Sequence, residues 1–325
     1  MSKCRRAVAF AIGICAAFCV PAAEQASNYP GRPVRLIVAN TTGTSVDTLA
    51  RILAAKMSEL LGQQMVADNR AGAGGIIGAE IAAQSTPDGY TLLVSSTGMQ
   101  VIAPQIYRKL NYHPIKDFEA ISLYAVTQNV LVVNPTLPIR TVKDLIALAR
   151  AYPGKYNMSN AGSGFQSHLA GVLFTYMTGL DVVHVPYKGG ASLTAVIANE
   201  AQFTIAPGPA VMTQVRANRL RAIASGGEKR SALTPDLPTI TESGVPGYVS
   251  TGWAGIMAPR GTAKPIRDKL HGAMAKALSD AATREQMERQ GGEPVISTPA
   301  EMLRVINDDY ARMGQAIKLA KLKVE

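Results

Sequence analysis

From Pro33 onward, short apolar runs alternate with helical patterns along the chain. An apolar run followed by an apolar stripe at steps of three and four is typical of a strand followed by a crossover helix. Such a helix returns the chain to the same end of the sheet, so the next strand runs parallel to the first. The alternation therefore predicts an α/β fold and argues against a sandwich or a helical bundle.

The first unit shows the pattern clearly. Residues 34–39 are predicted to form a strand, and the apolar positions of residues 46–61 lie on one face of a helix that ends at Gly62. Further strands are predicted at 65–67, 91–94, 121–125, 130–133, 156–159, 182–185, 203–205, 220–224 and 253–258. Helices are predicted at 76–84, after the capping pattern Thr141-Val142-Lys143-Asp144, at 167–177, and three times between Pro265 and Ala320.

The strand and helix units fall into two series. They join near residues 127–133, and the chain returns near residues 250–257. A length of 325 residues with 47% apolar residues is also too long for one ordinary domain. We therefore expect two lobes, each a mainly parallel sheet flanked by helices, joined by two crossing strands. Lobe 1 is expected to comprise residues 29–127 plus 251–325, and lobe 2 residues 128–250.

The N-terminus has the features of a secretory signal peptide. Lys3, Arg5 and Arg6 precede an apolar run over residues 7–20, which is followed by the small residues Ala22 and Ala23. The run is shorter than the roughly 20 residues that a membrane-spanning helix needs. Residues 1–23 are therefore expected to be removed on export. The three cysteines fall inside this segment, and lipid attachment at Cys19 is an alternative that the bulky Phe18 disfavours.

The charge balance bears on the class of partner. The formal net charge is +10, and loss of the three basic residues of the leader leaves 10 − 3 = +7. The basic residues are dispersed, and no run of Lys and Arg exceeds two. This pattern is not typical of a nucleic-acid-binding protein. A mild attraction of anionic solutes is the better interpretation.

Several segments that follow predicted strands share hydroxyl, amide and glycine residues. In open α/β sheets, ligands bind outside the carboxyl ends of the strands. Glycine allows close approach of backbone N–H groups, and a following helix N-terminus favours negative charge, so these segments suit a carboxylate held without a covalent step. The same residue types also cap helices and form turns. The candidate binding residues are Asn40, Thr41, Thr42, Gly43, Thr44, Ser45, Ser95, Ser96, Thr97, Gln128, Ser159, Asn160, Gly162, Ser163, Gly164, Phe165, Ser167, Tyr187, Lys188, Gly189, Pro207 and Gly208.

No catalytic residue is predicted in these segments. Ser163 has Ala161 and Phe165 two positions away, so it does not fit the glycine-flanked nucleophile elbow of hydrolases. His168 and His184 are expected to have packing roles. No metal site is predicted either, because no H-x-x-H or H-E-x-x-H spacing occurs. A secreted α/β hydrolase remains the alternative from another class.

Two further motifs have structural interpretations. The glycines of residues 72–78 have the spacing G-x-G-x-x-x-G, one residue longer than the dinucleotide fingerprint, so no cofactor is predicted. Asp47 and Arg51 lie four residues apart at a helix start and are expected to form an ion pair.

An ordered series of motifs runs along the whole mature chain. It comprises Tyr29-Pro30, Pro33-Val34-Arg35-Leu36-Ile37-Val38, Asp47-Thr48-Leu49-Ala50-Arg51, Asn69-Arg70-Ala71-Gly72-Ala73-Gly74-Gly75, Pro87-Asp88-Gly89-Tyr90-Thr91-Leu92-Leu93, Phe118-Glu119-Ala120-Ile121-Ser122-Leu123, His168-Leu169-Ala170-Gly171, Val185-Pro186-Tyr187-Lys188-Gly189-Gly190, Trp253-Ala254-Gly255 and Ala258-Pro259-Arg260-Gly261-Thr262. In this series, the chain resembles the substrate-binding proteins of tripartite tricarboxylate transporters, the Bug proteins.

The resemblance implies a two-lobed, type II-like periplasmic binding protein fold that closes around a carboxylate. It implies a monomer in the periplasm that delivers its ligand to integral membrane permease subunits, although some relatives act as sensors or scavengers. The carboxylate-binding roles of the family map onto Thr42, Gly43, Thr44 and Ser45, with lobe 2 contributing residues 159–167 and 187–190.

Three departures from the family pattern concern the ligand. Residues 40–43 read Asn-Thr-Thr-Gly where the family usually has Pro-Gly-Gly. Pro207-Gly208 replaces a stretch that often carries an Asp, which makes an amino-acid ligand less expected than a di- or tricarboxylate or an aromatic carboxylate. Phe165 stands where a small polar residue is usual, as a wall of the site or a surface for an aromatic acid. Lys188 is a second candidate anchor for the carboxylate, or a solvated side chain.

Overall fold

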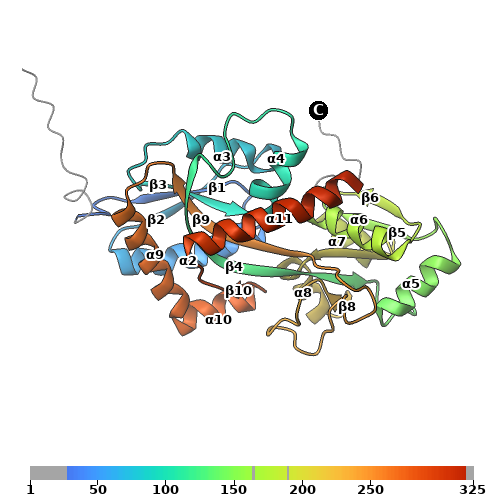
Figure 1. Cartoon of the computed structure of the whole chain (residues 1–325). Coiled ribbons are helices and arrows are strands. Elements are labelled where there is room, and N and C mark those ends of the chain that lie inside the picture. Colours follow the sequence, from blue (N-terminus) through green and yellow to red (C-terminus); the bar gives the residue numbers. More distant parts are fainter. Residues whose placement is uncertain (1–27, 163–164, 189, 320–325) are drawn as a thin grey trace, which may run out of the picture.

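The computed structural model describes residues 28–162, 165–188 and 190–319. Lobe 1 is built on β1 (Val34–Val38), β2 (Met65–Asn69), β3 (Thr91–Ser96), β9 (Thr251–Pro259), β10 (Glu293–Pro294) and the first part of β4 (Phe118–Val133). Lobe 2 is built on the last part of β4 with β5 (Asn157–Asn160), β6 (Val183–Pro186), β7 (Phe203–Pro207) and β8 (Arg221–Ser225). Figure 1 shows the two lobes side by side along β4.

Helices cover both lobes. Those of lobe 1 are α2 (Ser45–Leu61), η1 (Ala73–Gly75), α3 (Ile76–Ala83), η2 (Gly98–Ile102), α4 (Ala103–Ile106), α9 (Lys264–Ser279), α10 (Ala281–Arg289) and α11 (Pro299–Leu319). Those of lobe 2 are α5 (Val142–Ala151), α6 (Gln166–Thr178), α7 (Ala191–Ile197) and α8 (Gly208–Arg216). The predicted caps are confirmed: Gly62 adopts φ 69° after α2, and Thr141 and Asp144 form a capping box at α5.

The strand order is β2-β1-β3-β9-β4-β7-β5-β6, with β8 and β10 also pairing with β4. In lobe 1, β1 is parallel to β2 and β3, and β9 runs antiparallel to both β3 and β4. In lobe 2, β5 is parallel to β6 and β7, and β7 and β8 run antiparallel to β4. Apart from β9 and the short β10 in lobe 1, and β4 in lobe 2, the strands of each lobe run in one direction, which confirms the two-lobed α/β prediction.

The prediction of two separate strands, at 121–125 and 130–133, is wrong, because these residues belong to one strand, β4. β4 pairs with β9 as far as Gln128, which lies opposite Thr251. From Asn129, which lies opposite Pro207, β4 pairs with β7. The polar residues 127–129, between the two predicted strands, interrupt the apolar pattern. The backbone nevertheless stays extended there, because its N–H and C=O groups are paired. The amide of Asn129 donates to the carbonyl of Ser250 at 3.2 Å, where the chain returns to lobe 1.

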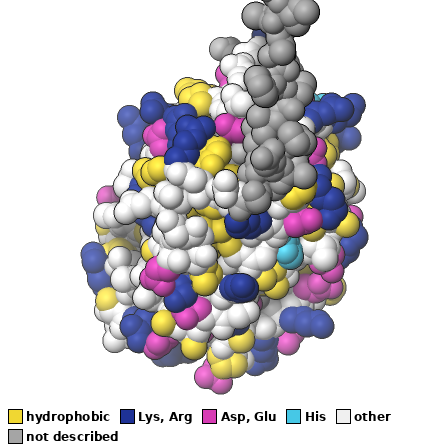
Figure 2. Space-filling model, turned by 90° about the vertical axis from the view of Figure 1, so that its left-hand side faces the viewer, with side chains coloured by type: hydrophobic (Ala, Val, Ile, Leu, Met, Phe, Trp, Pro, Cys, Tyr) yellow, Lys and Arg dark blue, Asp and Glu magenta, His cyan; other side chains and the backbone are white. Residues whose placement is uncertain are grey.

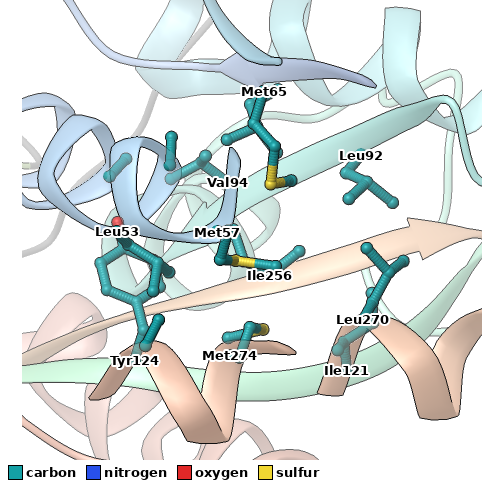
Figure 3. Packing of buried hydrophobic residues seen from close by; sticks show 14 of the residues in the cluster. Leu53, Met57, Met65, Leu92, Val94, Ile121, Tyr124, Ile256, Leu270 and Met274 are labelled. Carbon is teal, nitrogen blue, oxygen red and sulfur yellow. The ribbon is translucent and has the colours of Figure 1, made fainter. Parts of the chain in front are cut away.

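The core of lobe 1 has two layers, because alternate residues of a strand face opposite sides of a sheet. Leu36 of β1 packs under α2 and α9, whereas Ile37 packs under α3 and α11. Figure 3 shows the first layer, in which Met57 of α2 and Met274 of α9 pack with the strand residue Ile256.

Lobe 2 repeats this arrangement and is linked to lobe 1 by one further helix. In lobe 2, Leu131 packs with α5 and α6, and Val132 packs with α7 and α8. The helix α11 also contacts α6, and Leu169 of α6 belongs to the second core layer of lobe 1. Figure 1 shows α11 running from lobe 1 towards α6 and β6.

Charged side chains of both signs are interspersed on the end of the molecule seen in Figure 2. Ion pairs at the surface of the protein include Lys264 with Asp268 at 2.7 Å and Arg32 with Asp88 at 3.1 Å. Within the described ranges, no helix has the length and hydropathy to cross a bilayer. The predicted signal peptide, residues 1–23, lies outside the described residues.

Candidate functional site

The carboxyl ends of the strands in the two lobes face one another. In lobe 1, β3 ends at Ser96, which pairs with Ala254 of β9. Three residues earlier on β9, Thr251 pairs with Gln128 of β4. In lobe 2, β7 ends at Pro207, which pairs with Asn129. Both edges therefore lie near the point where β4 passes from one lobe to the other, and the candidate segments follow these edges.

The first candidate segment, residues 40–45, leads into α2 as predicted, but it uses part of its hydrogen-bonding capacity internally. The amide of Gly43, at φ 81°, donates to Asp47 Oδ2 at 2.9 Å. The hydroxyl of Thr44 donates to the carbonyl of Thr41 at 2.9 Å and accepts from the amide of Asp47 at 3.4 Å as the N-cap. The Gly43 amide and the Thr44 hydroxyl, two donors expected to face a ligand, are thus engaged within the segment and the first turn of α2.

Other donors of this segment have no acceptor within α2. The amide of Thr48 donates to the carbonyl of Thr44, and this is the first intrahelical bond. The amides of Ser45 and Val46 precede it, so they have no partner in the helix. Together with the exposed Thr42, they place donors and the positive end of the helix dipole at the edge of lobe 1.

A buried network holds the first segment in place. Asp47 is 2% exposed and accepts from Arg51 Nε at 3.0 Å and from Asn69 Nδ2 at 2.8 Å. The Asn69 amide group also donates to the carbonyl of Asn40 at 3.0 Å. Burial acts to raise the pKa of Asp47, but the hydrogen bonds from Arg51, Gly43 and Asn69 outweigh it and hold that pKa below its usual value. The predicted pair of Asp47 and Arg51 is confirmed, whereas the hydrogen bond from Asn69 to Asp47 was not predicted.

The second candidate segment, residues 95–97, is buried at the end of β3. The hydroxyl of Thr97 accepts from the backbone amide of Trp253 at 3.0 Å, so this side chain joins the segment to β9. Ser96 is 6% exposed, and the hydroxyl of Ser95 has no hydrogen-bond partner.

In lobe 2, two of the candidate hydroxyls are used within the lobe. Ser159 donates to the carbonyl of Ser192 at 2.7 Å, and the hydroxyl of Ser167 accepts from the amide of Ala161 at 3.0 Å. Asn160 differs, because its Oδ1 accepts from the amide of Gly162 at 3.0 Å while its buried Nδ2 has no partner. Ser163, Gly164 and Gly189 lie outside the described residues.

The remaining candidates also lie on the lobe 2 edge or at the crossing. Phe165 and Lys188 are exposed, and Tyr187 is half-buried with its amide donating to the carbonyl of Asn160 at 2.9 Å. Pro207 and Gly208 form the start of α8, and a Cβ on Gly208 would lie 3.0 Å from the carbonyl oxygen of Gln128. Gln128 Nε2 donates to the carbonyl of Lys229 at 3.1 Å.

Buried polar atoms without a hydrogen-bond partner gather at these facing edges. More than 90% of buried polar groups in proteins are paired, so such a concentration offers places where ordered water or a polar ligand can bind. Gln166 was not predicted, although it adjoins a candidate segment and its side chain lies within 3 Å of the position that a Cβ on Gly252 of β9 would take. The unpartnered atoms along the edges are Asn40 Oδ1, Ser95 Oγ, Gln128 Oε1, Asn129 Oδ1, Asn160 Nδ2, Gln166 Nε2 and Ser225 Oγ.

The two histidines of lobe 2 have the packing role expected for them. Their rings lie edge to face with centroids 5.8 Å apart, and His184 Nε2 is 3.3 Å from the hydroxyl of Thr175. Burial lowers the pKa of both imidazoles, and with the additional effect of His168 the pKa of His184 falls to about 4. Among the described residues, no three His, Cys, Asp or Glu side chains are grouped as metal ligands.

Comparison with known proteins gives consistent matches over the chain. The family model described as tripartite tricarboxylate transporter family receptor matches residues 49–322. Protein BugT of Bordetella pertussis is 36% identical over 308 residues, which cover 94% of each chain. The solved structure of R. palustris Rpa4515 with adipate is 35% identical, with a TM-score of 0.83 over 91% of this chain and 99% of the other. MatC from Rhodopseudomonas palustris with bound malate is 28% identical, with a TM-score of 0.78 over 89% of this chain and 100% of the other.

Proposed function

This chain belongs to the tripartite tricarboxylate transporter receptor family, and from that premise we propose that it is a periplasmic solute-binding protein. It captures a small carboxylate between its two lobes and delivers it to the membrane permease of such a transporter. Binding involves no chemical step and no cofactor, because the candidate segments consist mainly of hydroxyl, amide and glycine residues. The protein acts as a monomer.

The unpartnered buried polar atoms along the two facing edges are the observation that supports this proposal. In lobe 1 they belong to Asn40, after β1, and Ser95 of β3. In lobe 2 they belong to Gln128 and Asn129 of β4, Asn160 of β5, Gln166 of α6 and Ser225 of β8. A polar solute held between the lobes would pair with both sets at once. This arrangement couples binding to the closure of the lobes, since neither edge alone can satisfy the ligand.

Similar proteins support a dicarboxylate ligand. The R. palustris structure at 35% identity contains adipate, and the MatC structure contains malate. In this chain, the amides of Ser45 and Val46 at the start of α2 would hold one carboxylate. The side-chain N–H groups of Asn160 and Gln166 would donate to the ligand from lobe 2.

The lobe boundaries belong to the same proposal. Lobe 1 comprises residues 29–127 plus 251–325, and lobe 2 comprises residues 128–250. Two features support these limits. β4 changes its pairing partner from β9 to β7 between Gln128 and Asn129, and the chain returns to lobe 1 at Ser250.

A thermal-shift screen of ligand-free mature protein against dicarboxylates tests the binding proposal. At a concentration of 100 times Kd, a ligand stabilises the native state by about 2.7 kcal/mol, which shifts the melting temperature by several degrees. No shift with any acid of a broad panel would contradict the proposal. A smaller radius of gyration with bound ligand, measured by X-ray scattering, would support closure of the lobes.

An isosteric variant tests the location of the site. Asn160→Asp keeps the oxygen that accepts from Gly162, but replaces the free Nδ2 by a negatively charged oxygen that repels a carboxylate. We expect at least about a tenfold loss of affinity, since a hydrogen bond to a charged group contributes about 1.5–3 kcal/mol. Asn218→Asp, at an exposed turn after α8, is the control for the added charge. Equal affinity of the two variants would place the ligand elsewhere.

Delivery to a permease requires its own measurement. Uptake of the labelled acid that binds the protein is compared in cells that have the chain and in cells that lack it, with the permease present in both. We expect uptake at low concentrations of the acid to depend on the chain. Uptake that is independent of the chain would instead favour a sensing or scavenging role.

A further inference from the structure

Phe165 occupies a position where the fold favours a different residue. It is the N-cap of α6, and its side chain makes no capping hydrogen bond. By contrast, Thr44, Thr141 and Asp280 cap α2, α5 and α10 with their side-chain oxygens. Ser, Thr, Asp and Asn are strongly preferred at such a position because they satisfy a free helix amide. A phenyl ring at this place therefore lowers the stability of the helix start.

The ring is also poorly buried. Phe165 is 56% exposed, although an aromatic side chain gains most of its stabilising effect from burial. One edge of the ring rests on Gly162, where an added Cβ would lie 3.1 Å from Cδ2 and 3.3 Å from Cε2. The same Cβ would lie 3.8 Å from the carbonyl oxygen of Tyr187. The ring is thus held at one edge, while much of its surface is open.

The surroundings of Phe165 belong to the lobe 2 edge of the candidate site. Gln166, the next residue, lies against Gly252 of β9, beside Thr127 of β4. Lys188 follows Tyr187 and is exposed. The lobe 2 edge therefore presents an exposed apolar surface at Phe165 and, next to the Tyr187 backbone that lies beside it, an exposed cation at Lys188.

We propose that Phe165 is a specificity-determining residue that selects dicarboxylates with an apolar spacer. This inference rests on the proposed function. One carboxylate binds the amides at the start of α2, the methylene chain covers the exposed face of Phe165, and the second carboxylate lies near Lys188. The ligand thereby buries the apolar surface that the free protein exposes, which explains why an apolar residue stands at the N-cap.

Calorimetry with straight-chain dicarboxylates of increasing length tests the proposal. Succinate, glutarate and adipate have the same two carboxylates and differ only in the number of methylene groups. Each buried methylene group contributes about a fourfold gain in affinity, so Kd should fall stepwise from succinate to adipate. In Phe165→Ser this increase with chain length should be largely lost, while the affinity for succinate stays within about twofold. Lys188→Met should weaken adipate binding several-fold and leave hexanoate unchanged.

A matched control and a second readout distinguish the role of Phe165 from general damage. Tyr176→Ser removes another aromatic residue, 64% exposed, near the other end of α6, and should leave all affinities unchanged. Phe165→Ser introduces a favourable N-cap, so its melting temperature should be equal to that of the native protein or higher. Lower affinity for adipate in a protein of undiminished stability would support the proposal.

Three results would overturn the inference. The first is a steep dependence on chain length that persists in Phe165→Ser, and the second is an equal loss of affinity for every dicarboxylate in that variant. The third is the absence of binding of any dicarboxylate to the native protein, whereas the proposed function is refuted only if no acid of the broad panel binds. Binding of succinate with no gain for adipate would refute only the role of Phe165.

Discussion

Replacement of Asp47 by Asn tests whether the buried network shapes the first candidate segment. The carboxylate accepts from the Gly43 amide at 2.9 Å, from Arg51 at 3.0 Å and from Asn69 at 2.8 Å. An Asn side chain has the same size, but an NH2 group replaces one of the two carboxylate oxygens. One of the three N–H donors then faces a donor instead of an acceptor, and Arg51 loses its counter-charge.

The size of the effect follows from these contacts. A hydrogen bond to a charged group contributes about 1.5–3 kcal/mol, and a buried group left without its partner adds a further cost. We expect Asp47→Asn to lower the free energy of unfolding by about 3 kcal/mol. For a chain of this length, this corresponds to a decrease in melting temperature of about 5 °C. Ligand affinity should also fall, because the amide of Gly43 no longer fixes the segment.

The pH dependence gives a second check. Because the pKa of Asp47 is lowered in the folded protein, its stabilising effect is complete above the unfolded value near 3.8 and is lost as the pH falls through the folded value. The difference in melting temperature between native protein and variant should therefore be constant from pH 7 to about pH 5 and shrink towards pH 3.

Asp268→Asn provides the control. Asp268 also pairs with a cation four residues away, Lys264 at 2.7 Å, but its side chain is 60% exposed. Exposed ion pairs contribute about 0–1 kcal/mol, so this variant should melt within about 1 °C of the native protein. If Asp47→Asn melts at the same temperature as Asp268→Asn, the network does not have the role described above.

Two further predictions concern the lobe contact and the buried histidine. At Gly291→Ala, a Cβ would lie 3.0 Å from the backbone nitrogen of Pro209 across the lobes, so ligand affinity should fall several-fold. Gly261→Ala, also at positive φ but with only a van der Waals contact at 3.9 Å to Pro87, should lose similar stability and keep its affinity by calorimetry. Folded His184 has a pKa of about 4, below its unfolded value, so acid destabilises the protein between pH 6.5 and 4. His184→Gln should reduce the difference in stability between pH 7 and pH 5 by on the order of 1 kcal/mol after allowance for partial exposure, and an unchanged difference in circular-dichroism melts would contradict this cause.

The local elements were largely predictable from the sequence, because the periods of strands and helices are properties of neighbouring residues. Thus α2 and its cap at Gly62, and the capping box of α5, agree with the prediction. The continuity of β4 was not predictable, since its polar residues are paired by segments more than a hundred positions away, such as Ser250. The short helix α8, which starts at Gly208, was hidden by the following proline.

The candidate site was predictable as a set of segments but not as a set of free donors. The positions of the segments follow from strand ends, which the sequence indicates. Whether the Gly43 amide or the Ser159 hydroxyl is free depends on partners elsewhere in the fold, here Asp47 and Ser192. Gln166 was missed because its role depends on the close approach of Gly252, which no local pattern reveals.

The place of β9 in the sheet has a consequence for the order in which the chain can fold. β9 lies between β3 and β4, yet it follows all the strands of lobe 2 in the sequence. The strands of lobe 2, from the end of β4 to β8, are complete by Ser225 and can pair early. Lobe 1 has no central strand until residues 251–259 are available, and until then β3 and β4 have open edges, through which chains can associate. A chain emerging on the far side of a membrane would therefore close lobe 2 first and protect lobe 1 only when its last quarter has followed.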